Sequence, residues 1–328
     1  MKGIVSRVES KDYYVLPENG MDEIRCSIKG KFRKDFNMKK DKMYKSDIVT
    51  VGDYVEYDVN EDKSGVIHKV YERKNYLSRK SPKVKGASYR GERMEQVIAA
   101  NIDNVVVVTS IKEPIFNNKV LDRFLVAAES SSLPVMIVVN KIDLDDDNEV
   151  DLIREIYERI GYDVHAISAK KKIFDDDLKN SLLGKKNLFW GHSGVGKSSI
   201  LNALFGFDFN TGIISNFTNK GTHTTVTAVM LKIVDNNSLA HDFNSEATYI
   251  IDTPGIREID PYGIKKEDLG HYFVEFRDFI PNCRFNTCTH QHEPGCGVLA
   301  AVEEGEIDPL RYDSYLRILE TIEEDIFF

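Results

Sequence analysis

The chain has 328 residues and carries 44 Lys and Arg against 53 Asp and Glu, and its net charge of −9 argues against a uniformly basic nucleic-acid-binding protein. Its longest apolar runs, such as Val105–Val108, are too short to span a bilayer, and residues 1–14 lack the apolar stretch of a signal peptide. Three of its four cysteines fall between Cys283 and Cys296, which argues against a disulfide scaffold. We therefore expect a cytoplasmic protein of two or three domains that does not bind membranes.

The charge is unevenly distributed along the chain. Residues 1–93 contain 22 Lys and Arg and 15 Asp and Glu, a net charge of +7, whereas the remainder contains 22 and 38, a net charge of −16. Such asymmetry suggests an interaction surface on the basic part of the chain. A solvated lysine-rich loop is the simpler explanation of the same counts.

Residues 1–72 are expected to form a small β-barrel. Five short segments cluster or alternate apolar residues between turn-forming Gly and Asn, which is the pattern of strands. They are Ile4–Val8, Tyr13–Leu16, Ile24–Ile28, Tyr54–Val59 and Gly65–Val70. This number of strands in so short a stretch favours an OB-fold, although an SH3-like barrel gives a similar pattern.

Two basic segments accompany the barrel. The lysine-rich stretch 31–45 contains Phe32, Phe36 and Tyr44, and such aromatics can stack on RNA bases while lysines contact phosphates. Closure of the barrel by the same aromatic side chains is the alternative. Residues 73–96 hold many Lys, Arg and Ser with few apolar residues, and we interpret them as a basic linker.

Residues 97–268 alternate apolar segments of strand length with amphipathic segments of helix length. The strand-like segments are Asn104–Thr109, Val135–Val139, Val164–Ile167, Asn187–Trp190 and Ala247–Ile251, and the helical ones include Leu121–Ser130 and Val150–Ile160. This alternation predicts an α/β domain with a mostly parallel sheet flanked by helices. Ligands of such domains bind at the carboxyl ends of the strands.

A base-recognition motif follows the second of these strand-like segments and consists of Asn140, Lys141, Ile142 and Asp143. An ionised aspartate offers two acceptor oxygens, which match two adjacent N–H donors of guanine, whereas adenine has no such pair. Lys141 can cover the plane of the base, and Asn140 can tie neighbouring loops together. Further along, another strand-like segment ends in Ser168, Ala169 and Lys170. Together the two segments predict a guanine site.

A complete phosphate-binding loop stands between a strand-like and a helix-like segment. It consists of Gly191, His192, Ser193, Gly194, Val195, Gly196, Lys197 and Ser198, and Ser199 opens the helix. Its glycines allow backbone N–H groups to converge on phosphate oxygens at a helix N-terminus. Lys197 can reach the β- and γ-phosphates and stabilise the reaction, and Ser198 can bind Mg²⁺. A chance glycine-rich turn would lack this strand–loop–helix context.

Two later segments complete the nucleotide motifs. In the sequence DTPG, the carboxylate of Asp252 can hold Mg²⁺, and the N–H of Gly255 can meet the γ-phosphate. Before it, Gly221–Thr225 contains Thr224 and Thr225, either of which can complete the Mg²⁺ shell. A polar loop without a metal contact is the alternative for this segment.

Residues 269–328 are expected to form a metal-binding module that ends in an acidic helix. Three thiols and an imidazole supply a full tetrahedral zinc shell, from Cys283, Cys288, His290 and Cys296. His292 competes with His290 for the fourth position. With no open position, one Zn²⁺ per chain would be structural, and the module would unfold without it. Three incidental buried cysteines are the alternative, and Cys26 in the barrel is expected to be a core thiol.

The nucleotide motifs are complete, but their order is unusual. The base-recognition motifs precede the phosphate-binding loop, whereas an ordinary small GTPase begins with that loop. A circular permutation produces this order while it keeps the sheet and its loops. Together with the stretch HSGVGKSS and the cluster that begins at Cys283, the order resembles the RsgA family of circularly permuted GTPases, and the resemblance covers essentially the whole chain.

The resemblance implies an OB-fold N-terminal domain, binding of GTP and GDP with Mg²⁺, and binding to the 30S ribosomal subunit and its 16S rRNA. It also implies ribosome-stimulated GTP hydrolysis and a role in late maturation of the subunit. Within the metal module it favours His290 over His292. Thr222 departs from the family pattern, which usually has Arg or Gln before the histidine. A monomer is the default expectation.

The catalytic residue is not the glutamine that many GTPases carry after their DxxG motif. Ile256 occupies that position and cannot orient water. His223 can orient a water molecule, and the resemblance points to the same residue, whereas contact with rRNA or packing is its alternative role. We therefore predict a GTP hydrolase that acts on the 30S subunit. Its rivals are a non-catalytic GTP-dependent rRNA-binding scaffold and a permuted GTPase of the large subunit.

Overall fold

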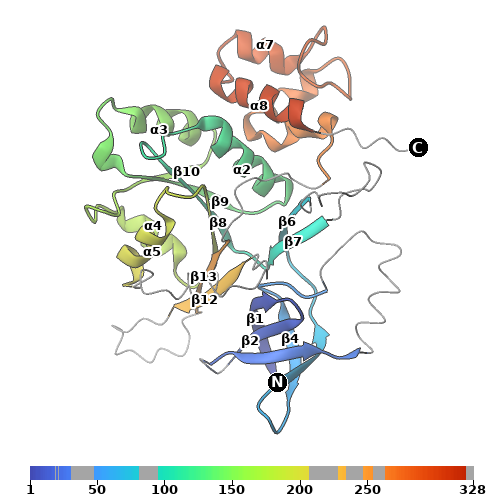
Figure 1. The fold of residues 1–328 in the computed structure, drawn as a ribbon. Coiled ribbons are helices and arrows are strands. Elements are labelled where there is room, and N and C mark those ends of the chain that lie inside the picture. The colour runs from blue at the N-terminus through green and yellow to red at the C-terminus, as the bar shows by residue number, and fades with distance from the viewer. Residues whose placement is uncertain are drawn as a thin grey trace, which may run out of the picture. The chain divides into compact units, whose positions relative to one another are not determined.

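The computed structural model of the chain describes residues 1–18, 20, 22–30, 48–80, 95–206, 228–233, 247–253 and 263–322 (Figure 1). These residues belong to two compact units. The N-terminal unit comprises residues 1–105, 176–190 and 197–258, and the C-terminal unit comprises residues 106–175, 191–196 and 259–328. None of the helices in the described ranges combines the length and the hydropathy that crossing a bilayer requires.

The N-terminal unit contains a closed barrel of five strands. They are β1 (Lys2–Glu9), β2 (Asp12–Pro17), β3 (Ile24–Ile28), β4 (Tyr54–Val59) and β5 (Gly65–Val70). Their order is β1-β2-β3-β5-β4, and β4 pairs with β1 again, so the sheet closes. The pair β3–β5 is parallel, and the other pairs are antiparallel. Alternate residues fill the core, which includes Val5, Val15, Val55, Tyr57 and the thiol of Cys26. The expected OB-fold barrel and the expected core thiol are confirmed.

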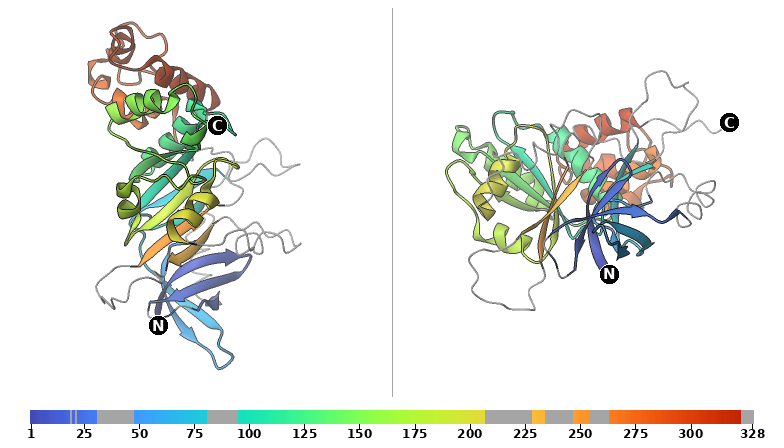
Figure 2. Two further views of the ribbon diagram at one scale, coloured as in Figure 1. Left: turned by 90° about the vertical axis from the view of Figure 1, so that its left-hand side faces the viewer. Right: turned by 60° about the horizontal axis from the view of Figure 1, so that its bottom comes forward.

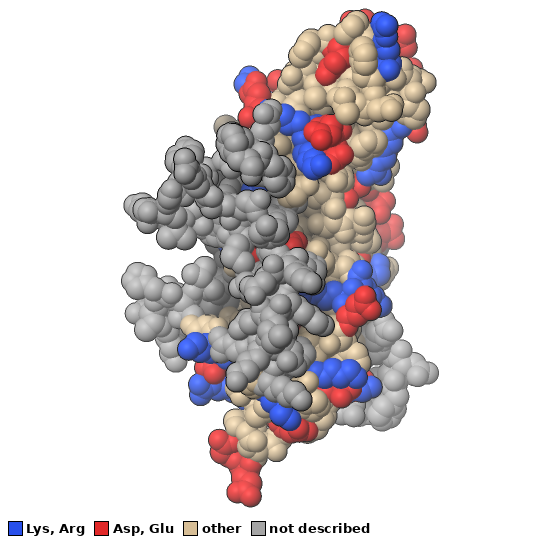
Figure 3. Space-filling model, turned by 90° about the vertical axis from the view of Figure 1, so that its right-hand side faces the viewer, with Lys and Arg blue, Asp and Glu red and all other residues tan. Residues whose placement is uncertain are grey.

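The expected interaction surface of the barrel can be judged only in part. The lysine-rich stretch 31–45, with its three aromatic residues, lies outside the described residues. On the face drawn in Figure 3, the described Lys and Arg side chains lie among Asp and Glu side chains rather than in one continuous basic patch. A basic surface therefore stays a prediction.

The stretch expected to be a linker contains a strand, so that expectation needs correction. β6 (Tyr76–Lys80) pairs antiparallel with β7 (Glu95–Ala100) in a separate two-stranded sheet. The barrel is joined to this sheet because the N–H of Ala100 donates to the carbonyl of Val51 at 2.8 Å. β6 was not predicted because its own residues are largely basic or polar. Its strand partner is an apolar segment farther along the chain.

The remaining strands of the N-terminal unit extend the barrel sheet. β11 (Lys186–Trp190), β13 (Thr248–Asp252) and β12 (Val229–Ile233) follow one another in the order β11-β13-β12-β1. β11 and β13 are parallel, and β12 is antiparallel to β13. β12 reaches β1 through the pair Val229 and Arg7. The helices α4 (Asp176–Leu182) and α5 (Lys197–Phe205) lie beside these strands (Figure 2).

The C-terminal unit begins with parallel α/β structure. β8 (Asn104–Ser110) starts in the N-terminal unit and continues here, and the strand order is β10-β9-β8 with β9 (Val135–Asn140) and β10 (Asp163–Ala166) parallel. The helices are α2 (Asn118–Ser130) and α3 (Glu149–Arg159). The side chain of Asn117 caps α2 by accepting from the N–H groups of its first turn. These elements agree with the predicted segments to within a few residues.

The end of the chain forms a helical module on α2. It consists of the 3₁₀ segments η3 (Lys266–Tyr272), η4 (Val274–Phe276) and η5 (Ile280–Asn282) and the helices α7 (Gly297–Glu303) and α8 (Pro309–Thr321). Both η3 and α8 pack against α2. Asp308 caps α8, and Pro309 occupies its first turn, where no N–H is needed. The predicted helix near Asp308 is confirmed.

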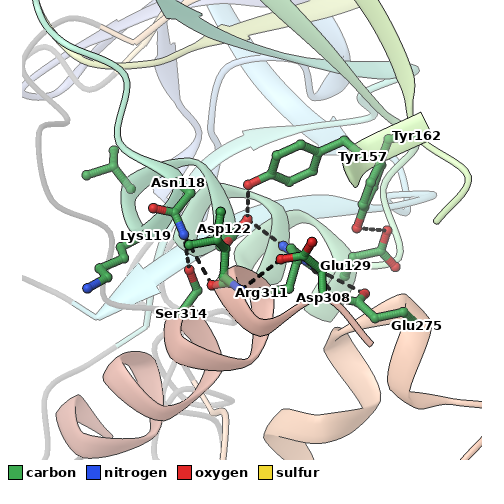
Figure 4. Close-up of polar contacts among 12 residues, drawn as sticks. Asn118, Lys119, Asp122, Glu129, Tyr157, Tyr162, Glu275, Asp308, Arg311 and Ser314 are labelled. Carbon is green, nitrogen blue, oxygen red and sulfur yellow. Dashed lines mark hydrogen bonds and ion pairs between the residues drawn. The ribbon is translucent and has the colours of Figure 1, made fainter. Parts of the chain in front are cut away.

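A buried ion cluster holds α8 against α2 (Figure 4). The guanidinium of Arg311 donates to Asp122 of α2 at 2.5 Å and to Glu275 at 2.7 and 3.0 Å, and Tyr157 also donates to Asp122 at 2.7 Å. Arg311 and Asp122 are fully buried. Loss of one partner of such a pair leaves an uncompensated buried charge and costs about 3–5 kcal/mol. The cluster therefore fixes the helical module on the α/β part of its unit.

Candidate nucleotide and metal sites

Asn140 ties three loops of the C-terminal unit together. It lies at the end of β9 and is 2% exposed. Its Nδ2 donates to the carbonyl of Val195 in the phosphate-binding loop at 2.8 Å, and its Oδ1 accepts from the N–H of Ala169 at 3.1 Å. Both ends of the side-chain amide are therefore used, as the sequence predicts for this residue. Because each bond is buried, the three loops are held in one fixed arrangement.

Asp143 and Lys141 extend this arrangement. The Oδ1 atom of Asp143 accepts a hydrogen bond from Ser168 Oγ, which itself accepts from the N–H of Lys171 at 3.1 Å. Lys141 adopts a left-handed backbone with φ 65°, and its Nζ donates to the carbonyls of Gly194, at 2.8 Å, and of Glu113. Neither contact was predicted, since nothing in the sequence marks a backbone carbonyl as a partner. The base-recognition residues thus form one connected group.

The glycines of the phosphate-binding loop are required by close packing. A Cβ atom on Gly196 would lie 2.3 Å from Asn140 Nδ2, and one on Gly191 would lie 2.2 Å from the carbonyl oxygen of Val108. Both residues also have positive φ angles, 100° and 152°. Only glycine meets both conditions. His192 packs its ring edge-on against Phe124 of α2, with the ring centroids 6.1 Å apart.

The N-terminal unit carries the residues expected to contact phosphate and metal. Lys197 begins α5 and Asp252 ends β13. Burial lowers the pKa of Lys197, against the opposing effect of the charge of Asp252. Burial also raises the pKa of Asp252, although Lys197 and the N–H of Thr253 oppose this shift. Both shifts disfavour the charged forms, which are the forms that phosphate and Mg²⁺ require.

Two buried oxygens of this region lack hydrogen-bond partners among the described residues. They are Asp252 Oδ1 and Thr253 Oγ1. Buried polar atoms are nearly always satisfied, so an ion or its bound waters would find two acceptors here. A carboxylate oxygen is a preferred contact of Mg²⁺ and its waters, and the residues present therefore fit Mg²⁺ with a nucleotide. Ser198 and Ser199 are exposed at the start of α5, where a phosphate would meet free N–H groups.

Several predicted site residues cannot be placed. Gly255, Thr224, Thr225, His223 and Ile256 lie outside the described residues.

The four predicted metal ligands converge in the C-terminal unit. The ligand atoms of Cys283, Cys288, His290 and Cys296 all lie within 4.8 Å of one another. His290 Nδ1 is 3.3 Å from Cys296 Sγ and 3.6 Å from Cys283 Sγ, and the latter two sulfurs are 3.9 Å apart. These separations suit a tetrahedral shell with metal–sulfur bonds of about 2.3 Å. His290, and not the exposed His292, belongs to the group. The cluster can hold a metal ion.

Neighbouring side chains hold the metal loop in position. Tyr312 and Tyr315 of α8 donate to the carbonyls of His290, at 2.7 Å, and Thr289, at 2.6 Å. Glu293 accepts from Thr289 and from two further backbone N–H groups. Although burial opposes it, this bonding lowers the pKa of Glu293 to about 2. Tyr312 and Tyr315 were not predicted from the sequence because they lie more than twenty residues from the carbonyls that they bond.

Comparison with protein families decides the relationship. The RsgA GTPase model matches residues 70–262, and the model of the RsgA N-terminal domain matches residues 2–67. The chain belongs to the RsgA GTPase family. The resemblance seen in the motif order is thereby confirmed, and the α/β part of the chain is that of a GTP hydrolase.

Relatives of this RsgA-family GTPase match it along its whole length. The Small ribosomal subunit biogenesis GTPase RsgA of Chlorobaculum parvum is 39% identical over 99% of both chains. The Small ribosomal subunit biogenesis GTPase RsgA 2 of Bacteroides thetaiotaomicron is 38% identical over 99% of this chain and 98% of its own.

Two solved structures are also similar. YjeQ from Thermotoga maritima has a TM-score of 0.71 and 35% identity, and the match covers 97% of each chain. YloQ, described as a circularly permuted GTPase, has a TM-score of 0.65 and 31% identity over 97% of this chain and 93% of that one. The permuted order inferred from the motifs agrees with this neighbour.

Proposed function

We propose that this RsgA-family GTPase binds the small ribosomal subunit and its rRNA, and that it hydrolyses GTP during late maturation of the subunit. The names of the full-length relatives support the partner. The bonded group around Asn140 carries the nucleotide part of the proposal, because it joins the base-recognition loops to the phosphate-binding loop. We further propose that the protein acts as a monomer in the cytoplasm.

The guanine base is assigned to the C-terminal unit. Asp143 accepts from the guanine N–H donors, Lys141 covers the base plane, and the loop of Ser168, Ala169 and Lys170 borders it. The bond between Ser168 and Asp143 supports this assignment, since it aligns the carboxylate. Asn140 acts by holding the loops together. A site built around an acceptor-only carboxylate rejects adenine, which would leave that carboxylate unpaired.

The phosphates and Mg²⁺ are assigned to the phosphate-binding loop and to Asp252. Lys197 would bond the phosphates, and Ser198 and Asp252 would hold Mg²⁺, whose charge would offset the negative charge of the reacting phosphates. Thr224 or Thr225 supplies a further ligand, and His223 orients the attacking water. The Oδ1 atom of Asp252, which has no hydrogen-bond partner among the described residues, supports the metal assignment, and the roles of the other three rest on the sequence pattern.

The metal of the cysteine cluster is proposed to be structural zinc. Three thiolates and one imidazole leave no open position, and such a set selects Zn²⁺. Metal analysis of the purified protein is expected to give about one Zn²⁺ per chain, and Cys288→Ala is expected to lose it. Cys26→Ala is the matched control, since Cys26 is a barrel thiol and its loss leaves the metal bound. Equal metal content in the two variants would contradict the proposal.

Pelleting with purified ribosomal subunits tests the partner. The protein is expected to sediment with small subunits in the presence of a non-hydrolysable GTP analogue, and less so with GDP. Large subunits serve as the control for the rival assignment. Sedimentation with large subunits alone would overturn the proposal, and binding to small subunits without any effect on turnover would favour the non-catalytic scaffold.

A further inference from the structure

A histidine–aspartate pair brackets the loop that carries Ser168. His165 lies on β10, and Asp175 follows the loop, and the Nδ1 atom of His165 is 2.9 Å from the Oδ2 atom of Asp175. A carboxylate only accepts, so the ring nitrogen donates. The side chain of His165 is 10% exposed and that of Asp175 is 31% exposed. The bond therefore joins the two ends of a ten-residue excursion of the chain, inside one unit.

Inside this bracket the loop closes on itself. The N–H of Ser168 donates to the carbonyl of Ile173 at 2.9 Å, and the N–H of Ile173 donates back at 3.0 Å. Ser168 Oγ points to Asp143, and the N–H of Ala169 bonds Asn140. The turn is thus held together by its own hydrogen bonds. It is attached to the rest of the unit through β10, through the segment that ends at Asp175, and through the bonds to Asp143 and Asn140.

His165 is a buried polar residue. It lines an open hollow of about 390 Å³ together with Arg154, Glu158, Tyr162, Asp163 and Asp175. We attribute the role of His165 to its hydrogen bond with Asp175.

We propose that His165 and Asp175 are positioning residues for guanine recognition. They set the place of the Ser168 loop, and through Ser168 they set the orientation of the Asp143 carboxylate that reads the base. Neither residue touches the nucleotide. This inference rests on the proposed role of Asp143 as the base reader, and it adds a determinant of selectivity that lies behind the recognition loop.

Two variants of His165 separate the hydrogen bond from the bulk of the side chain. His165→Leu keeps an apolar side chain of similar volume without a donor, whereas His165→Asn places an amide N–H near the position of Nδ1. Binding of GDP and of inosine diphosphate, which lacks one guanine N–H donor group, is measured by fluorescence titration. His165→Leu is expected to weaken GDP binding about tenfold and to reduce the preference for GDP over inosine diphosphate, and His165→Asn is expected to restore both.

The outcomes distinguish this inference from the base-reader assignment. Unchanged GDP affinity and selectivity in folded His165→Leu would overturn the inference, as would a loss that His165→Asn fails to restore. If His165→Leu does not fold, Asp175→Ala, which removes the acceptor, is measured in its place with the same expectation for selectivity. Asp143→Asn is the reference variant. If Asp143→Asn binds GDP normally, the base-reader assignment fails. If Asp143→Asn loses GDP binding while the His165 variants bind normally, only the positioning role is contradicted.

Discussion

The base-recognition loops and the phosphate and metal residues differ in how their polar groups are satisfied. In the C-terminal unit, Asn140 uses both ends of its amide, and Asp143 is bonded to Ser168. In the N-terminal unit, Asp252 has a buried oxygen without a partner among the described residues. Burial raises the pKa of Asp252 and lowers the pKa of Lys197, and both shifts disfavour the charged form. We infer that the first region is preformed and that the second gains a partner when its ligand binds.

This difference has a physical consequence for nucleotide binding. A preformed base site provides selectivity without reorganisation, because its carboxylate is already aligned. A site with an unsatisfied carboxylate binds Mg²⁺ and phosphate with an added gain, since the ligand removes a penalty that the free protein bears. Substitution in the base-recognition loops should therefore destabilise the nucleotide-free protein. Substitution of Asp252 should leave that stability nearly unchanged and should impair Mg²⁺-dependent activity.

The largest effect is expected from Asp143→Asn. An amide cannot accept from both guanine N–H donors, and it brings an N–H group of its own against them, so GTP affinity is expected to fall by at least about a thousandfold. Fluorescence titration with GTP and ATP measures both affinity and selectivity. Unchanged GTP affinity with normal selectivity would remove Asp143 from the base site.

A smaller effect is expected from Asn140→Ala in the absence of nucleotide. The substitution leaves the carbonyl of Val195 and the N–H of Ala169 buried without partners, which costs about 2 kcal/mol. The midpoint of urea unfolding of the nucleotide-free protein measures the loss. If the midpoint does not move, the base-recognition loops are not preformed in the way described.

The smallest effect on stability is expected from Asp252→Asn. The free energy of unfolding of the nucleotide-free protein should change by less than about 1 kcal/mol, because Oδ1 has no hydrogen bond to lose among the described residues. Mg²⁺-dependent GTP hydrolysis should nevertheless be lost. Fluorescence of Trp190, the only tryptophan and a fully buried one, reports unfolding in this unit.

Asp53→Asn is the matched control for that substitution. Asp53 is a buried carboxylate of the same unit, and Arg73 bonds both of its oxygens, at 2.7 and 2.8 Å. Breaking this pair should cost about 3 kcal/mol. Equal destabilisation by Asp53→Asn and Asp252→Asn would contradict the inference that Asp252 gains its partner only when a ligand binds.

The sequence predicts local structure and motif chemistry well, because both depend on residues close together in the chain. The five barrel strands, the loops that follow β9 and β11, and the four metal ligands all have a short-range pattern. Contacts between residues far apart in the chain have no such sequence pattern. Arg311 and Asp122 meet across 189 positions, and Lys141 contacts a backbone carbonyl, so neither pair was foreseen. β6 was missed because its strand partner, and not its own composition, makes it a strand.

The pairing of His165 with Asp175 belongs to the same class. Nothing in the composition of β10 marks its histidine, since a single His in a strand is most often a packing or surface residue. Its proposed role depends on its hydrogen bond to Asp175, which lies at the other end of the loop of Ser168. Positioning residues of this kind are visible only when the loops around a site are known in three dimensions.

Steady-state GTP turnover with and without purified small ribosomal subunits tests the proposed function most directly. Turnover by the protein alone should be slow, and saturating small subunits should raise it by at least about tenfold, since a partner can order or complete a catalytic loop. His223→Ala should lose the stimulated rate while it keeps GTP binding. A rate that stays flat when small subunits are added and bound would contradict a ribosome-stimulated hydrolase and would leave the scaffold as the better description.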